Sequence, residues 1–203
     1  MSKKLIITIG REFGSEGHEI GKELAERLGI AMYDKDLLAI AAKRSGVAVE
    51  HLANVDESIT NRFIEPYLGF VMGNDNLNDK LFAEESQIIR DIASKESCII
   101  IGRCADYILK DDPDTVHAFI YAPYEVRVRI IKEKHGITEE AAKKLVKKMD
   151  QVRNSYYTFY AGKGWNRKEG KDVLLNRAKF GIDGCVDILE AMARNRMQEQ
   201  TQS

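Results

Sequence analysis

Three short apolar runs constrain the fold of this chain more than any other feature. They are Leu5–Ile9, Cys98–Ile101 and Val116–Tyr121, and a weaker fourth run lies at Asp172–Leu175. Short, continuous apolar runs are typical of strands that are buried on both faces of a parallel sheet. Helical patterns separate these runs, so we predict an α/β fold in which helices flank a parallel sheet.

The helices are predicted from apolar periodicity and from their end signals. In the stretch after the first run, Ile20, Leu24 and Leu28 recur every four residues and form one apolar face. Thr138 is expected to cap a further helix by accepting a hydrogen bond from the amide of Ala141. The segments predicted to be helical are Gly17–Leu28, Asp34–Lys43, Ala83–Ser94, Tyr124–Lys134, the stretch after Thr138, and Gly184–Arg196.

Length, charge and cysteine content limit the classes of protein that this chain can belong to. A chain of 203 residues fits one globular domain, and a net charge of -1 argues against a general nucleic-acid binder. No apolar stretch is long enough to cross a membrane. The three cysteines lack a metal-binding spacing, so we expect reduced thiols and a cytoplasmic location. The oligomeric state is not indicated.

A glycine-rich turn follows the first apolar run and leads into the first predicted helix. The N-terminus of a helix attracts phosphate through free N–H groups, and the glycines Gly14, Gly17 and Gly21 let the backbone approach an anion. The spacing does not match the G-x-x-x-x-G-K-[ST] phosphate loop, however. A plain strand-to-helix turn with acidic residues in its first turn is therefore an open alternative.

The residues that replace the usual lysine and hydroxyl change the chemistry of this turn. His18 and Glu19 stand at those positions. Histidine is charged only part of the time near neutral pH, whereas lysine is a fixed charge. A glutamate can offer an oxygen ligand to Mg²⁺, or it can repel phosphate. Arg11 is a nearby cation that can compensate.

Several stretches together resemble the cytidylate kinase-like family, a branch of the P-loop nucleoside monophosphate kinases. They occur in the family's order across nearly the whole chain: "IGREFGSEGHEIGKELAERLG", "MYDKDLL", "IIIGRCADYIL", "FIYAPYEVRVRII", "KKMDQVRNSYYTFYAGKGW" and "DVLLNRAKFGIDG". The resemblance implies one P-loop kinase-like domain over residues 1–203, with ATP and Mg²⁺ as cofactors. It implies phosphoryl transfer to a nucleoside monophosphate, CMP or dCMP. The expected partners are small-molecule nucleotide substrates, with no nucleic acid and no membrane.

The same resemblance divides the chain into regions. It implies a core of residues 1–33, 97–123 and 171–197. It also implies an acceptor-binding insertion at about 34–96 and an arginine-bearing helical lid at about 124–170. Within the insertion, Gly46–Asn78 carries mixed signals and is interpreted as a mobile substrate-side segment.

Site residues follow from the positions that match the family's motifs. The implied nucleotide phosphate-binding residues are Arg11, Gly14, Ser15, Glu16, Gly17, His18 and Glu19, and Glu19 is also the implied metal ligand. The implied acceptor-binding residues are Asp34, Asp36 and Arg103. The implied catalytic residues are Arg103, Arg127, Asp150 and Arg153. Arg129 matches a second basic position at the entry to the lid.

The chain departs from the family pattern at a few of these positions. Glu16 replaces a glycine of the phosphate loop, and Cys104 follows Arg103 where the cytidylate kinases have aspartate. The loop expected near adenine, usually "NTSKLG", reads "NRAKFG" and differs at Arg177 and Ala178.

Each assignment has a structural alternative. Arg127 and Arg129 are two residues apart, so at most one of them faces a site if the segment is helical. Asp150 and Arg153 can form an ion pair within one helix, and Asp34 can cap a following helix. Tyr156, Tyr157, Tyr160 and Trp165 can pack the lid rather than stack on a base.

Two alternative functions also stay open. One is a P-loop kinase of another small-molecule acceptor, motivated by Cys104 and by the pair Asp34 and Asp36. The other is a nucleotide-binding regulator without turnover, motivated by His18 and Glu19.

Overall fold

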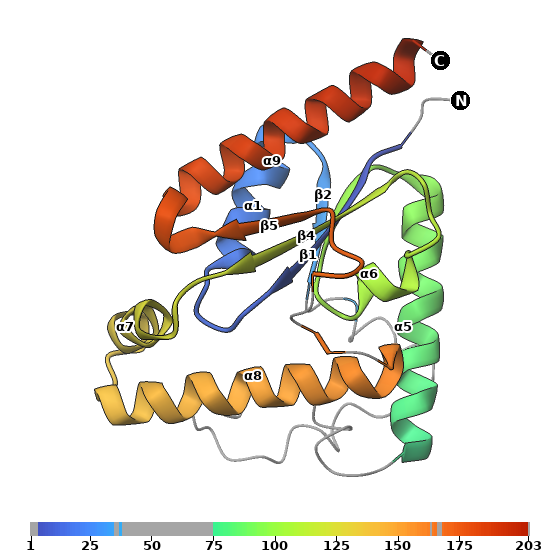
Figure 1. The fold of residues 1–203 in the computed structure, drawn as a ribbon. Helices are drawn as coiled ribbons and strands as arrows, with labels where there is room; N and C mark the ends of the chain where they lie inside the picture. The colour runs from blue at the N-terminus through green and yellow to red at the C-terminus, as the bar shows by residue number, and fades with distance from the viewer. Residues whose placement is uncertain (1–3, 35–36, 38–74, 163, 166–167, 203) are drawn as a thin grey trace.

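The computed structural model describes residues 4–34, 37, 75–162, 164–165 and 168–202 (Figure 1). Within these ranges, five parallel strands form one sheet in the order β2-β3-β1-β4-β5. The strands are β1 Ile6–Arg11, β2 Ala31–Tyr33, β3 Cys98–Ile101, β4 Thr115–Tyr121 and β5 Val173–Asn176. The prediction of a parallel α/β sheet is confirmed. The edge strand β2 was not predicted, because its three residues, although apolar, form a run too short to stand out as a strand.

The described helices follow the predicted ones closely along much of the chain. They are α1 Gly17–Leu28, α5 Asp75–Lys95, α6 Ala105–Ile108, α7 Tyr124–His135, α8 Glu139–Ala161 and α9 Arg177–Gln202. The Thr138 cap is confirmed, since its hydroxyl oxygen accepts from the Ala141 amide at 3.2 Å. The predicted helix Asp34–Lys43 and the segment Gly46–Asn78 lie outside the described residues, apart from Asp34, Leu37 and residues 75–78, which begin α5.

Two of the predicted helix starts were wrong. α5 begins at Asp75 rather than Ala83, so its first two turns were missed. α9 begins at Arg177 rather than Gly184, and Gly181 interrupts it with φ 70° and ψ -173°. The polar first turn of α9 has no apolar periodicity, and therefore the sequence gives no sign of it.

The central strands are buried on both faces, which explains why their sequences are apolar throughout. Ile7 and Ile9 of β1 and Ile101 of β3 pack with α1 and α9 on one face of the sheet. Ile6 and Ile100 point to the other face and pack with α5 and α6. Figure 1 shows α1 and α9 together on one side of the sheet, with α5 and α6 on the opposite side.

A third apolar cluster holds the glycine-rich turn. Phe13, in that turn, packs with Val128 and Ile131 of α7 and with Val146 and Met149 of α8. In Figure 1, α8 runs across the end of the molecule from α7 towards α5. The turn after β1 is therefore fixed by helices that come more than a hundred residues later in the chain.

All three cysteines are buried as free thiols. Burial raises the pKa of Cys98 to about 12, and burial also raises the pKa of Cys104 well above its ordinary value. A low thiol pKa is a requirement for cysteine nucleophiles, so these thiols have a packing role. Within the described residues, no helix combines the length and the apolar character that a bilayer span requires.

Candidate active site

The turn between β1 and α1 is shaped by positive backbone angles. Gly14 has φ 81°, and a Cβ there would lie 3.0 Å from both the Arg127 carbonyl oxygen and the Ile131 side chain. Glycine is therefore required for both its backbone angle and its small size. Glu16 caps α1 in the left-handed region with φ 58° and makes no side-chain capping hydrogen bond. The turn thus presents the N-terminus of α1 with its first-turn amides at the edge of the sheet where the strands end.

A cavity of about 350 Å³ opens at this helix end. It lies between the glycine-rich turn, the end of β2 and one side of α7. Its lining residues are Arg11, Glu12, Phe13, Gly14, Glu16, Gly17, His18, Glu19, Asp34, Ile130, Ile131, Lys134, His135 and Arg153. The structure therefore brings the predicted phosphate-binding residues, except Ser15, together with Asp34 and Arg153. Asp36 lies outside the described residues.

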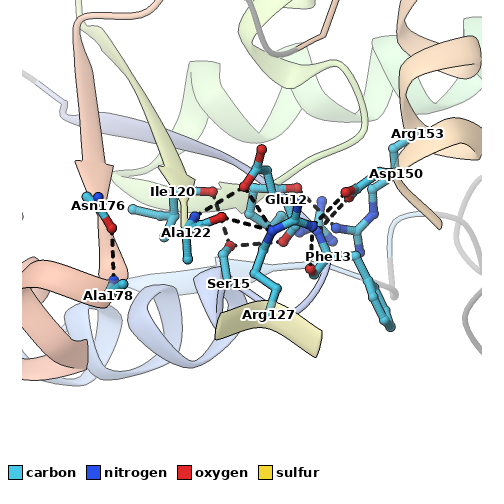
Figure 2. Close-up of polar contacts among 11 residues, drawn as sticks. Glu12, Phe13, Ser15, Ile120, Ala122, Arg127, Asp150, Arg153, Asn176 and Ala178 are labelled. Carbon is cyan, nitrogen blue, oxygen red and sulfur yellow. Dashed lines mark hydrogen bonds and ion pairs between the residues drawn. The ribbon is translucent and has the colours of Figure 1, made fainter. Parts of the chain in front are cut away.

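Ser15 supports the turn from behind. Its buried hydroxyl donates to the carbonyl oxygens of Glu12 at 2.9 Å and Ile120 at 3.1 Å (Figure 2). The hydroxyl is thereby committed to the backbone of the turn and of β4. The Ser15 amide also donates to the Glu12 carbonyl oxygen, at 3.3 Å, so both polar hydrogens of Ser15 are used within the turn.

Cations from separate elements hold the carboxylates of the cavity wall. Asp34 binds the His18 imidazole at 2.7 Å and the Arg11 guanidinium at 3.5 Å. Burial acts to raise the pKa of Asp34, but the His18 hydrogen bond and the Arg11 charge outweigh it and lower that pKa. Asp34 at the end of β2 therefore joins that strand to Arg11 of β1 and to the first turn of α1.

Glu19 has a cation of its own on α7. Its carboxylate accepts from Lys134, whose helix covers the cavity. Burial opposes ionisation of Glu19, yet the Lys134 hydrogen bond and its own amide lower the carboxyl pKa overall. An ionised Glu19 fits the predicted Mg²⁺ ligand, because Mg²⁺ is held by one or two carboxylates together with substrate phosphates. Among the described residues, no three His, Cys, Asp or Glu side chains gather into a metal-binding group of their own.

Arg127 is buried beneath the turn and binds several acceptors. Its guanidinium donates to the carbonyl oxygens of Ala122 and Phe13, each at 3.0 Å. It also pairs with Asp150 at 2.6 Å and Glu12 at 3.1 Å (Figure 2). These contacts hold the turn against α7 and α8. None of these contacts tests the prediction that Arg127 binds a phosphate. Its neighbour on α7, Arg129, is exposed, so only one of the two arginines points inward.

Asp150 and Arg153, on successive turns of α8, bind different parts of the first strand and its turn. One Asp150 oxygen accepts from the Phe13 amide at 2.9 Å, and the other accepts from Arg127. Arg153 donates to the carbonyl oxygen of Arg11 at 3.0 Å and lies over the Phe13 ring. Asp150 therefore caps the backbone of the turn from α8, a contact that no sequence pattern indicated.

A second, much smaller hollow of about 20 Å³ lies beside the first, at the end of β3. Arg11 and Arg153 line both spaces. The other lining residues are Gly10, Gly102, Arg103, Cys104, Asp106, Tyr156, Tyr157, Trp165 and Lys171. The predicted acceptor residue Arg103 is thus next to the predicted donor cavity.

Arg103 is held in an unusual backbone conformation. Arg103 and Cys104 both lie in the left-handed region, with φ 57° and 52°. The buried guanidinium of Arg103 pairs with Glu85 at 3.2 Å, and the Tyr156 hydroxyl donates to the other Glu85 oxygen at 3.2 Å. Burial raises the pKa of Glu85, although Arg103 and Tyr156 oppose that shift. Strained backbone of this kind is concentrated at functional sites.

Lys171 is a buried cation that sequence reasoning missed. Its ammonium group binds Asp106, and it lies 5.0 Å from the centre of the Tyr157 ring. The Tyr157 hydroxyl donates to the same carboxylate at 2.8 Å. Only the fold brings Lys171, which precedes β5, to the helix that follows β3. No motif or spacing signals this contact.

The predicted lid aromatics have two kinds of surroundings. Tyr160 stacks on Phe82 with ring centroids 3.7 Å apart, and Tyr156 meets both rings edge-on. Trp165 approaches the edge of Phe119 at 5.3 Å. Packing therefore accounts for Tyr160, whereas Tyr156, Tyr157 and Trp165 also line the small hollow.

Comparison with known proteins gives results that agree with this arrangement. A cytidylate kinase from Pyrococcus horikoshii is 24% identical over 190 residues, which span 93% of this chain and 88% of the relative. An uncharacterized protein from Eubacterium ventriosum has a solved structure that covers 94% of this chain and 99% of its own, at 29% identity and TM-score 0.72.

Shikimate kinase from Acinetobacter baumannii, at 14% identity and TM-score 0.53 over 96% of each chain, shares the fold, which is that of the P-loop kinases. The model of the cytidylate kinase-like family matches residues 6–179, a span that runs from β1 through the glycine-rich turn and α8 to the start of α9. With the motifs, the fold and this match in agreement, the chain belongs to the cytidylate kinase-like family.

Proposed function

We propose that this protein transfers the γ-phosphoryl group of ATP to a nucleoside monophosphate, with CMP or dCMP as the acceptor. One observation carries the proposal. The cavity at the N-terminus of α1 and the hollow at Arg103 are adjacent and share Arg11 and Arg153. Donor and acceptor phosphates bound in these two places would meet between arginines. Family membership supports the same reaction.

Phosphoryl transfer depends on positioning and charge neutralisation, and this chain offers both. The amides of the first turn of α1 bind the donor phosphates, and Lys134 adds positive charge from the cavity wall. Arg103 binds the acceptor phosphate. Arg153, whose helix covers the turn, lies between the two groups.

In the proposed reaction, an oxygen of the acceptor phosphate forms a bond to the γ-phosphorus of ATP. The bond from that phosphorus to the β,γ-bridging oxygen breaks, and ADP leaves. Mg²⁺, held through Glu19 and the phosphates, would neutralise charge on the transferring group. We place this reaction in the cytoplasm, where buried free thiols of this kind stay reduced.

A different acceptor is the second candidate, and Cys104 favours it. This position has aspartate in the cytidylate kinases, whereas here a buried thiol follows Arg103. The thiol is a weak hydrogen-bond partner for a base. Lys171 and Asp106 offer other polar groups in the same hollow.

A coupled ADP-release assay with ATP, Mg²⁺ and a panel of nucleoside monophosphates tests the proposal. A CMP-dependent rate well above the rate without acceptor would support it and name the acceptor. If another small metabolite is phosphorylated and CMP is not, that metabolite would take the place of CMP as the proposed acceptor. Tight ATP binding without transfer to any acceptor would favour the third possibility, a nucleotide-binding regulator.

A further inference from the structure

The two residues that depart most from the family pattern are partners in the structure. Glu16, which replaces a glycine of the phosphate loop, forms an ion pair with Arg177, which begins α9. They are 161 positions apart by their residue numbers, so no local pattern links them. Their side chains are 17% and 23% exposed, so both are largely buried. Glu16 lines the main cavity, and Arg177 adjoins that cavity through this ion pair.

Glu16 places an anion where a phosphate is expected. It caps α1 with φ 58°, a conformation in which a side chain is strained and glycine is not. It also lines the cavity at the helix N-terminus. A negative group is favourable at this end of a helix. The Glu16 carboxylate makes no hydrogen bond to the amides of α1 and pairs with Arg177 instead, so these amides stay available to a phosphate.

Arg177 is held at the same edge of the sheet and has an unused donor. It follows β5 directly, and Asn176 orders this turn by accepting from the Ala178 amide at 3.0 Å (Figure 2). The Arg177 Nε is buried and has no hydrogen-bond partner among the residues that the structure describes. A guanidinium presents several donors in a planar fork and binds phosphate through two of them at once.

We propose that Arg177 binds a phosphate of the donor nucleotide and that Glu16 is the internal anion that holds it until the nucleotide arrives. This inference rests on the proposed function, since it takes a nucleoside triphosphate as the ligand. On binding, Arg177 exchanges the Glu16 carboxylate for a phosphate of higher charge. The exchange supplies a fixed cation to a loop that has His18 in place of lysine.

In the alternative, Arg177 has only a structural role, in which its ion pair with Glu16 holds the loop in place. We call this role a clamp. ATP dissociation constants of four chains separate the two roles: the wild type, Glu16→Gly, Arg177→Thr and the double variant. Glycine suits φ 58°, so Glu16→Gly removes the competing anion without new strain. Titration calorimetry without an acceptor measures ATP binding alone. The matched control is Arg194→Thr, which removes an exposed arginine of the same helix.

We expect Glu16→Gly to tighten ATP binding. In that background, Arg177→Thr should weaken ATP binding by roughly tenfold to a hundredfold, the loss of a charge-assisted hydrogen bond. Inorganic tripolyphosphate should show the same loss, because the contact is to phosphate. A clamp would make Arg177→Thr silent once Glu16 is gone, and that result would overturn the proposal. Loss with ATP but not with tripolyphosphate would also overturn it.

Failure of the proposed function is a separate outcome. If ATP binds and the Arg177 effect appears, but no acceptor is phosphorylated, the inference stands and the kinase assignment does not. If the wild type binds neither ATP nor tripolyphosphate, both fall. Should Glu16→Gly fold poorly, Glu16→Gln keeps the chain length of the side chain and replaces it in the same comparison.

Discussion

Arg127 and Asp150 form a 2.6 Å ion pair beneath the glycine-rich turn, between the first turn of α7 and the middle of α8. The arginine is almost fully buried and reaches Glu12 as well. Asp150 also accepts the Phe13 amide. One guanidinium thus fixes the turn to both helices.

Arg127→Leu should destabilise the fold by about 3–5 kcal/mol, because it leaves Glu12 and Asp150 together without their cation. Urea unfolding at pH 7 measures this loss. Burial already raises the pKa of Glu12 against the Arg127 charge, and losing that charge raises it further. The deficit should therefore shrink at pH 4–5, where Glu12 takes up a proton. Arg129→Leu, at the exposed neighbour, is the control and should cost less than 0.5 kcal/mol. A deficit below about 1 kcal/mol for Arg127→Leu would contradict this account.

Arg103→Ala should raise the acceptor KM by roughly tenfold to a hundredfold, the loss expected for a charged hydrogen bond. The KM for ATP should change little, since Arg103 faces the smaller hollow. Initial rates with each substrate varied separately measure both constants. Arg103→Lys keeps the positive charge near Glu85 but loses the planar guanidinium donors, so it should restore the acceptor KM only in part. Unchanged acceptor kinetics in Arg103→Ala would remove Arg103 from the site.

His117 should make stability depend on pH. Burial lowers its pKa below the ordinary 6.5, although Asp106 and Asp172 oppose that shift. As pH falls below 6.5, the unfolded chain takes up the proton before the folded chain does. Stability is therefore complete above pH 6.5 and decreases as pH falls towards the lowered value, by at most about 1.4 kcal/mol per pH unit.

His117→Gln keeps a polar group beside Thr8, whose hydroxyl contacts the imidazole Nδ1 at 2.8 Å. Urea unfolding from pH 7.5 to 5 should give a shallower slope for this variant than for the wild type in the same buffers. Equal slopes would show that another group causes the dependence.

Two glycines of α1 should respond differently to alanine. A Cβ at Gly21 would lie 2.6 Å from Ile101, so Gly21→Ala should cost about 1–3 kcal/mol by forcing α1 from the sheet. Gly29 has φ 65° and open space around it, so Gly29→Ala should cost only backbone strain, about 1–2 kcal/mol. Thermal and urea unfolding measure the loss of stability in each of the two variants. A further cavity-creating change, Ile101→Val, should relieve Gly21→Ala and leave Gly29→Ala unaffected.

The elements that the sequence predicted are those with strong local signals. Buried strands such as Cys98–Ile101 are apolar without interruption, and α1 and α7 end at glycines, Gly29 and Gly136, with positive φ. The edge strand β2 and the single turn α6 carry no such signal. α6 follows two left-handed residues, Arg103 and Cys104, whose conformation only the surrounding structure can impose.

The site was predictable where its residues are neighbours in the chain. The turn from Gly14 to Glu19 was singled out because its glycines follow the first apolar run. Its interpretation as a phosphate loop came from the other stretches that resemble the family, since its own spacing matches no phosphate-loop motif. The pairs that hold it, such as Lys134 with Glu19, join elements that are far apart in sequence. Lys171 with Asp106 is a further case, and no spacing rule reaches across that distance.

The pairing of charges around the main cavity determines how a nucleotide approaches it. Arg127, Lys134 and Arg177 each already have a carboxylate partner, so the cavity projects little net positive potential. Such a site does not draw anions from a distance, and its association rate should vary weakly with ionic strength. Under the proposed exchange of Glu16 for a phosphate, recognition would occur at contact, and it would be governed by how long each nucleotide stays bound rather than by how fast it arrives.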